Sequence, residues 1–67
     1  MSERVLLLAQ QDIISVIQQK MRATYDEARA IADNILKTID WNNPALMHKG
    51  IRWIALQYLK KNYNIAA

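Results

Sequence analysis

The sequence predicts an all-α protein, a compact three-helix domain that assembles as a homodimer. Apolar residues recur at three- and four-residue spacing in three segments of the chain. Helix-start signals precede these segments, and a single glycine and a single proline leave long stretches uninterrupted. With 67 residues the chain forms one domain at most. We expect a single helical domain over residues 1–67, with helices at about 3–21, 25–39 and 44–62.

The first predicted helix starts after Ser2, whose hydroxyl suits an N-cap because it can accept a bond from a first-turn N–H. Leu7 and Ile14 widen the apolar stripe of this helix to nearly half its circumference, which is more than one packing partner usually covers. The apolar run Val5–Ala9 is far shorter than the ~18 residues of a membrane span, so we interpret it as part of the helix. The stripe itself consists of Val5, Leu6, Ala9, Ile13, Val16, Ile17 and Met21.

The second predicted helix has the clearest start. Thr24 and Glu27 have the spacing of a capping box, in which each side chain accepts a bond from the other residue's backbone N–H. Arg29, Asp33 and Lys37 follow one another at four-residue spacing, which allows ion pairs on the solvent side. The inner face consists of Ala28, Ile31, Ala32, Ile35, Leu36 and Ile39.

The third predicted helix follows the break Asp40–Pro44. Asn43 suits an N-cap and Pro44 the first helical position, where its missing N–H has no consequence. Gly50 inside this helix costs about 1 kcal/mol relative to alanine, or it marks a later helix start. The expected core face consists of Met47, Ile51, Ile54, Ala55 and Tyr58.

Composition excludes several kinds of site. The chain has no cysteine, one histidine and one glycine, which excludes disulfides, thiolate metal sites and glycine-rich phosphate loops. We therefore expect no enzyme, no metal and no cofactor. A core this small rarely stabilises a fold by itself. Small proteins usually add disulfides, a metal ion or oligomerisation, and the composition leaves oligomerisation as the expected one. The absence of cysteine also fits a reducing compartment, so we expect a cytoplasmic protein without a membrane span.

Charge is divided unevenly along the chain. Residues 1–40 carry five basic and six acidic side chains, whereas residues 41–67 carry four basic side chains and no acidic one. On a helical wheel one side of the third helix mixes cations with large apolar groups, which is typical of a binding surface. That side consists of Lys49, Arg52, Trp53, Leu56, Lys60 and Tyr63. We therefore predict partner-binding residues at Trp41, Lys49, Arg52, Trp53 and Lys60.

Several alternatives stay open at this point. Trp53 and Leu56 could simply belong to the core, and Trp41 could cap the core rather than anchor a partner. The leading hypothesis is a small non-enzymatic regulator or inhibitor that acts by protein–protein interaction, of the kind that phages or bacteria use as accessory proteins. The alternative is a small basic nucleic-acid-binding transcription regulator, whose cations neutralise phosphates. A membrane-surface helix over residues 44–63 and a scaffold that binds only itself are further possibilities.

The segment Asn42–Gly50 resembles part of one protein family. The middle-operon regulator (Mor) activators of Mu-like phages have a dimerisation region of two helices and a short segment that contains proline and ends in a basic residue and glycine. Here Asp12–Lys37 would match the two helices, and Lys49–Gly50 the basic-glycine end. The proline is displaced to Pro44, asparagines replace a glycine pair, and the chain has no room for the family's helix-turn-helix. The resemblance implies a dimer that regulates through protein contact rather than through reading DNA.

Overall fold

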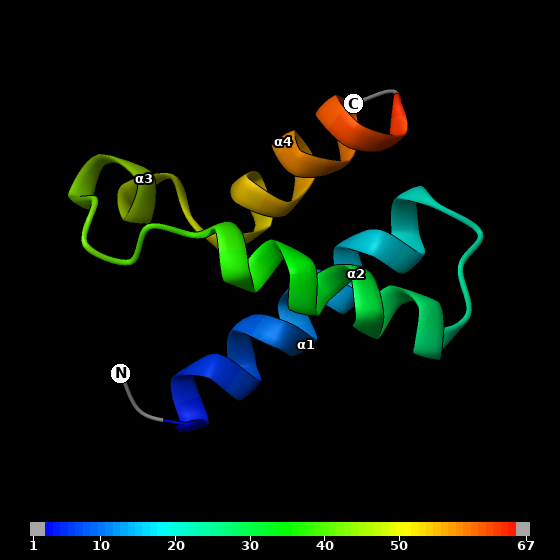
Figure 1. Ribbon diagram of the computed structural model, residues 1–67, viewed down its shortest axis with the longest axis horizontal. Coiled ribbons are helices and arrows are strands. Elements are labelled where there is room, and N and C mark those ends of the chain that lie inside the picture. Colours follow the sequence, from blue (N-terminus) through cyan, green and yellow to red (C-terminus); the bar gives the residue numbers. More distant parts are fainter. Residues whose placement is uncertain (1–2, 66–67) are drawn as a thin grey trace.

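The computed structural model describes residues 3–65, and this part of the chain contains four α-helices and no strand (Figure 1). The all-α class predicted from the sequence is confirmed. The predicted N-cap Ser2 lies outside the described residues. None of the helices in this range is long and apolar enough to cross a membrane. The helices are α1 (Glu3–Lys20), α2 (Tyr25–Thr38), α3 (Pro44–Lys49) and α4 (Ile51–Tyr63).

The turn between α1 and α2 ends in the predicted capping box. The Glu27 N–H donates to the Thr24 hydroxyl at 3.2 Å, and the Thr24 N–H donates to the Glu27 carboxylate at 3.1 Å. The bond from the Thr24 backbone, assisted by the Thr24 side chain, lowers the pKa of Glu27 from its ordinary value of 4.5. These bonds satisfy first-turn donors that would otherwise lack partners and so fix the start of α2.

The single third helix predicted over 44–62 is wrong, because the chain breaks it at Gly50. Gly50 has φ 94° and ψ 158°, a conformation that a residue with a Cβ rarely adopts. Its N–H donates to the Met47 carbonyl at 3.2 Å and closes α3, while its carbonyl accepts from the Ile54 N–H and opens α4. The start of α3 is as predicted, with Pro44 in the first turn and the Asn43 side chain accepting from the Leu46 N–H at 3.2 Å.

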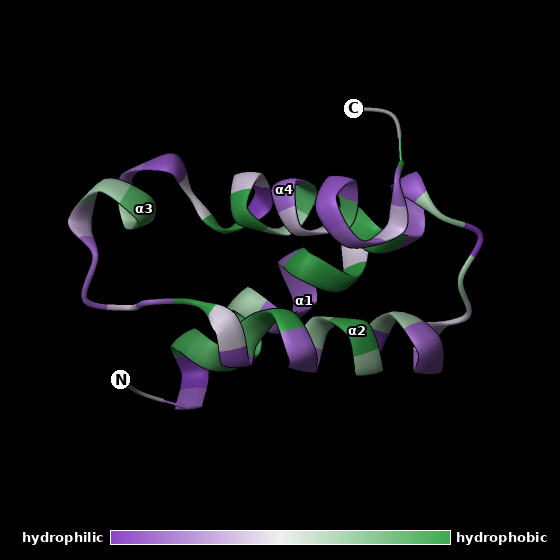
Figure 2. Ribbon diagram, turned by 45° about the horizontal axis from the view of Figure 1, so that its top comes forward, coloured by the Kyte–Doolittle hydropathy of each residue, from purple (hydrophilic) through white to green (hydrophobic). Residues whose placement is uncertain are grey.

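The core forms where α1 packs between α2 and α4 (Figures 1 and 2). Ile13 and Ile17 of α1, Ile35 of α2 and Leu59 of α4 are fully buried. Burying a side chain of this size stabilises the fold by about 1.5–3 kcal/mol. No polar side chain of the described residues is buried. Small residues at the helix crossings allow the backbones to approach closely, and these are Ala28, Ala32 and Ala55.

The amino-terminal turns of α1 extend beyond this core. Figure 1 shows them below α2 and away from α4, and Ala9 is the first buried residue of α1. The predicted inward positions Val5 and Leu6 are therefore 47% and 38% exposed, which corrects the sequence-based assignment. The physical reason is length, because α1 has 18 residues and α4 only 13, so α4 cannot cover all of α1.

Candidate partner-binding surface

The corner between α3 and α4 brings two of the predicted site residues together. Lys49 is the last residue of α3, and Trp53 lies in the first turn of α4. The Lys49 Nζ lies over the Trp53 ring, 5.3 Å from its centroid. A cation at this distance is attracted by the negative face of the indole, by about 0.5–1 kcal/mol at an exposed site. The contact spans Gly50, so the break in the helix sets the position of Lys49 relative to the ring.

Trp53 is a surface residue. Its side chain is 39% exposed, whereas the next two residues, Ile54 and Ala55, are buried in the core. The possibility that Trp53 forms part of the core is therefore wrong. Leu56 is half-buried, so its exposure lies between that of Trp53 and that of the buried Ile54 and Ala55. An indole held in place on a helix and partly open to solvent can bury a large apolar area against a second molecule.

Arg52 extends the same surface toward α1. Its guanidinium lies 3.9 Å from the carboxylate of Asp12, and the two side chains are 60% and 55% exposed. Solvent screens an ion pair that is this open, so we expect it to contribute at most about 1 kcal/mol. Its main effect is on local charge, since Asp12 partly neutralises a guanidinium that would otherwise face solvent alone.

The other two predicted residues differ in their surroundings. Lys60 follows Trp53 by seven residues, which places it on the same side of α4, and it is half-buried. Trp41 lies in the turn before α3 and packs against the core cluster, so it acts as a cap on the core. We use the name basic aromatic surface for the remaining four residues, Lys49, Arg52, Trp53 and Lys60.

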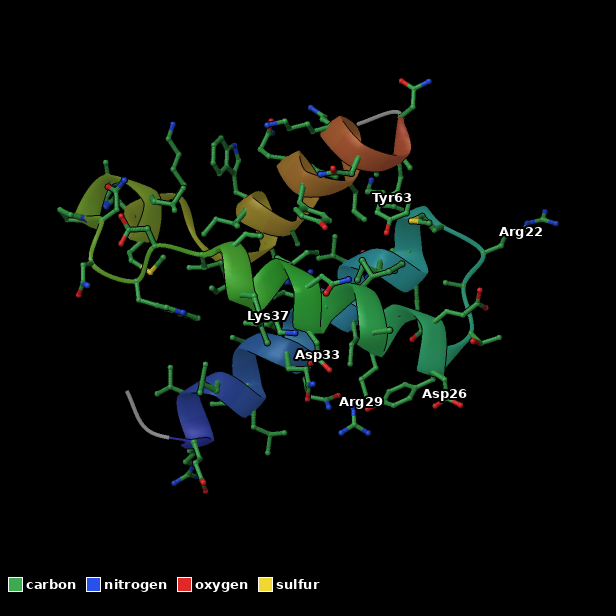
Figure 3. All side chains as sticks on the ribbon, viewed as in Figure 1. Arg22, Asp26, Arg29, Asp33, Lys37 and Tyr63 are labelled. Atoms are coloured by element: carbon green, nitrogen blue, oxygen red, sulfur yellow. The ribbon has the colours of Figure 1, made fainter. Side chains whose placement is uncertain are left out.

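Sequence reasoning missed the acidic neighbour of this surface and misassigned the charges on α2. The predicted ion pairs among Arg29, Asp33 and Lys37 are not formed within the described residues, where the one ion pair is Arg52–Asp12. Figure 3 shows these three side chains along α2, and the Asp33 carboxylate accepts a bond from the Gln10 amide at 2.7 Å. The contacts of Asp12 and Asp33 both cross between helices, so no spacing within one helix indicates them.

Within the described residues no group of three or more histidine, aspartate or glutamate side chains could hold a metal ion. No protein-family model, curated protein or solved structure matches the chain. The resemblance of Asn42–Gly50 to the phage activators therefore stays a prediction that rests on those residues alone.

Proposed function

We propose that this chain is a small non-enzymatic regulator or inhibitor that works as a homodimer and binds another protein through its basic aromatic surface. The observation that carries the proposal is the exposed Trp53 ring with the Lys49 ammonium 5.3 Å from its centroid. Tryptophan and arginine are enriched among the residues that dominate binding energy at protein interfaces. In this chain Trp53 and Arg52 are adjacent on one exposed turn of α4.

The surface defines the chemistry of its partner. A ring that is already held by a helix and a cation loses little conformational freedom when it is buried, which favours binding. The cations beside it require carboxylates around the pocket that receives the ring. The partner is therefore a protein with an apolar pocket bordered by aspartate or glutamate side chains.

Two features make a nucleic acid the weaker candidate. Asp12 lies 3.9 Å from Arg52, so a phosphate approaching the guanidinium meets a carboxylate as well. Lys49 and Lys60 are the remaining cations of the surface, so a dimer offers about four phosphate contacts, fewer than the six to ten that make binding steeply salt-dependent. Light scattering with and without a mixed-sequence DNA duplex, at low and high salt, separates the two candidates. A complex that forms with DNA and dissolves in salt would favour nucleic acid.

The decisive test is the substitution Trp53→Ala. It removes an exposed ring, so we expect the helical circular dichroism to stay within a tenth of the wild-type signal. We expect the partner's affinity to fall by about 30-fold or more, which corresponds to a hot spot of about 2 kcal/mol. The matched control is Tyr25→Ala, which removes another exposed aromatic side chain, on α2.

The measurement starts with immobilised wild-type protein and both variants, exposed to the same cell extract and compared by quantitative mass spectrometry. A protein retained by wild type and by Tyr25→Ala but not by Trp53→Ala is purified and titrated against all three. Equal affinity for wild type and for Trp53→Ala would remove the basic aromatic surface from the binding site. Loss of helicity in Trp53→Ala would show that the ring supports the fold instead.

A further inference from the structure

A hollow with an apolar lining lies between the first turns of α1 and the end of α2. Leu7 and Leu6 stand at this hollow with 57% and 38% of their surface exposed, and Leu36 lies opposite on α2. Apolar patches rimmed by polar residues on soluble proteins mark interaction sites. We call this feature the α1–α2 hollow. Its lining consists of Glu3, Leu6, Leu7, Gln10, Leu36 and Lys37.

The charges of the α1–α2 hollow are balanced. Glu3 lies on its α1 side and Lys37 on its α2 side, so the rim carries one charge of each sign. The basic aromatic surface, in contrast, carries three cations. Two copies that met through the basic aromatic surface would bring like charges together, whereas two copies that met through the hollow would not.

The shape of the hollow favours the same conclusion. A two-fold interface needs a surface that is complementary to itself, because residue i of one copy contacts residue j of the other and the reverse. Leu7 lines the hollow and is 57% exposed, so it can enter the hollow of a second copy beside Leu36. A two-fold axis through the hollow would set Glu3 of one copy against Lys37 of the other, because the two residues lie on the α1 and α2 sides of it.

We propose that two copies of this chain dimerise through the α1–α2 hollow, each inserting Leu7 against the partner's Leu36, with Glu3 paired to the partner's Lys37. This inference rests on the homodimer of the proposed function and assigns its interface. The basic aromatic surface, which lies on α3 and α4, then stays open to another protein.

The first test is sedimentation equilibrium of wild type, Leu7→Glu and Leu8→Glu over a wide range of concentrations. Leu8 is the matched control, because it is 61% exposed but does not line the hollow. At 100° per residue it lies about 160° around α1 from Leu6. We expect Leu7→Glu to raise the dimer dissociation constant by about 100-fold and Leu8→Glu to leave it within a few-fold of wild type.

The second test exchanges the rim charges. Glu3→Lys places two lysines opposite each other across the dimer, and Lys37→Glu places two glutamates there, so we expect each variant alone to be monomeric. A 1:1 mixture of the two variants restores both opposite-charge pairs, and we expect it to form a heterodimer. A variant that merely failed to fold could not be rescued in this way.

The outcomes separate the two proposals. A monomeric wild type at every concentration would overturn both the homodimer and its interface, and vesicle binding that Leu7→Glu abolished would then assign the hollow to a membrane surface. A dimeric wild type that Leu7→Glu leaves unchanged would overturn the interface alone. If Leu8→Glu weakened the dimer as much as Leu7→Glu, and the mixture of the two charge variants formed no heterodimer, the interface would lie elsewhere on α1.

Discussion

The conformation of Gly50 predicts the effect of a single methyl group on the fold. With φ 94° and ψ 158°, this residue occupies a region that is almost restricted to glycine. Placing a Cβ there forces the backbone either to keep a strained conformation or to abandon the break between α3 and α4. We expect Gly50→Ala to lower the free energy of unfolding by about 1–2 kcal/mol.

This magnitude follows from the surroundings of Gly50. A Cβ at this position meets no heavy atom within 4 Å, so a steric clash contributes nothing. Backbone strain costs about 1–3 kcal/mol. The entropy that alanine removes from the unfolded chain offsets about 0.4–1 kcal/mol of it, and the centres of the two ranges leave a loss within about 1–2 kcal/mol. For a domain of this length the difference lowers Tm by about 4–16 °C.

Urea denaturation followed by circular dichroism measures the free energy, and tryptophan fluorescence reports on the combined surroundings of Trp41 and Trp53. The control is the same chain made by chemical synthesis with D-alanine at position 50, which adds the methyl group but favours positive φ. We expect this control to be as stable as wild type or more so. If Gly50→Ala unfolds at the wild-type urea concentration, the backbone of Gly50 does not determine the break, and the reasoning is refuted.

Two further predictions concern the core and the capping box. Ile35→Ala, at a fully buried position, should destabilise the fold by about 2–5 kcal/mol in the same urea assay, whereas Leu8→Ala on the exposed side of α1 should stay within about 0.5 kcal/mol; similar losses for both would contradict the burial pattern. Because the pKa of Glu27 is lowered in the folded state, its stabilising contribution is complete above its ordinary value of 4.5 and is lost as the pH falls through the folded pKa. Glu27→Gln should therefore make Tm less sensitive to acid below about pH 4.5, and an unchanged acid dependence would assign that sensitivity to other carboxylates.

Local signals in the sequence predicted the starts of α2 and α3 accurately. The Thr24–Glu27 capping box and the Asn43–Pro44 pair each depend on residues three positions apart or fewer, so the chemistry that fixes them is visible in the sequence. The sequence allows a helix boundary at Gly50, yet the continuous apolar pattern on both sides favours one helix. The positive φ of Gly50 divides the segment into two helices, and the spacing of apolar residues carries no information about φ.

Features that depend on the packing of distant segments could not be predicted. The apolar pattern of α1 continues to Val5, and only the shorter length of α4 reveals that the first turns stay uncovered. In the same way, Asp12 reaches Arg52 across forty residues of sequence. The residue types of the candidate site are visible in the sequence, but the acidic neighbour of Arg52 and the packing of Trp41 against the core required the fold.

The division of charge along the chain gives the two surfaces different uses. The hollow belongs to α1 and α2, whose part of the sequence is nearly neutral, and the basic aromatic surface belongs to α3 and α4, whose part carries only cations. A dimer formed through the hollow would therefore present two copies of Trp53 without covering either. A partner with two acidic sites within reach would gain about 10²–10⁴ in affinity from the second contact. Leu7→Glu should then weaken binding to such a partner while leaving affinity for an isolated single site unchanged, a separation that partial unfolding of the chain cannot produce.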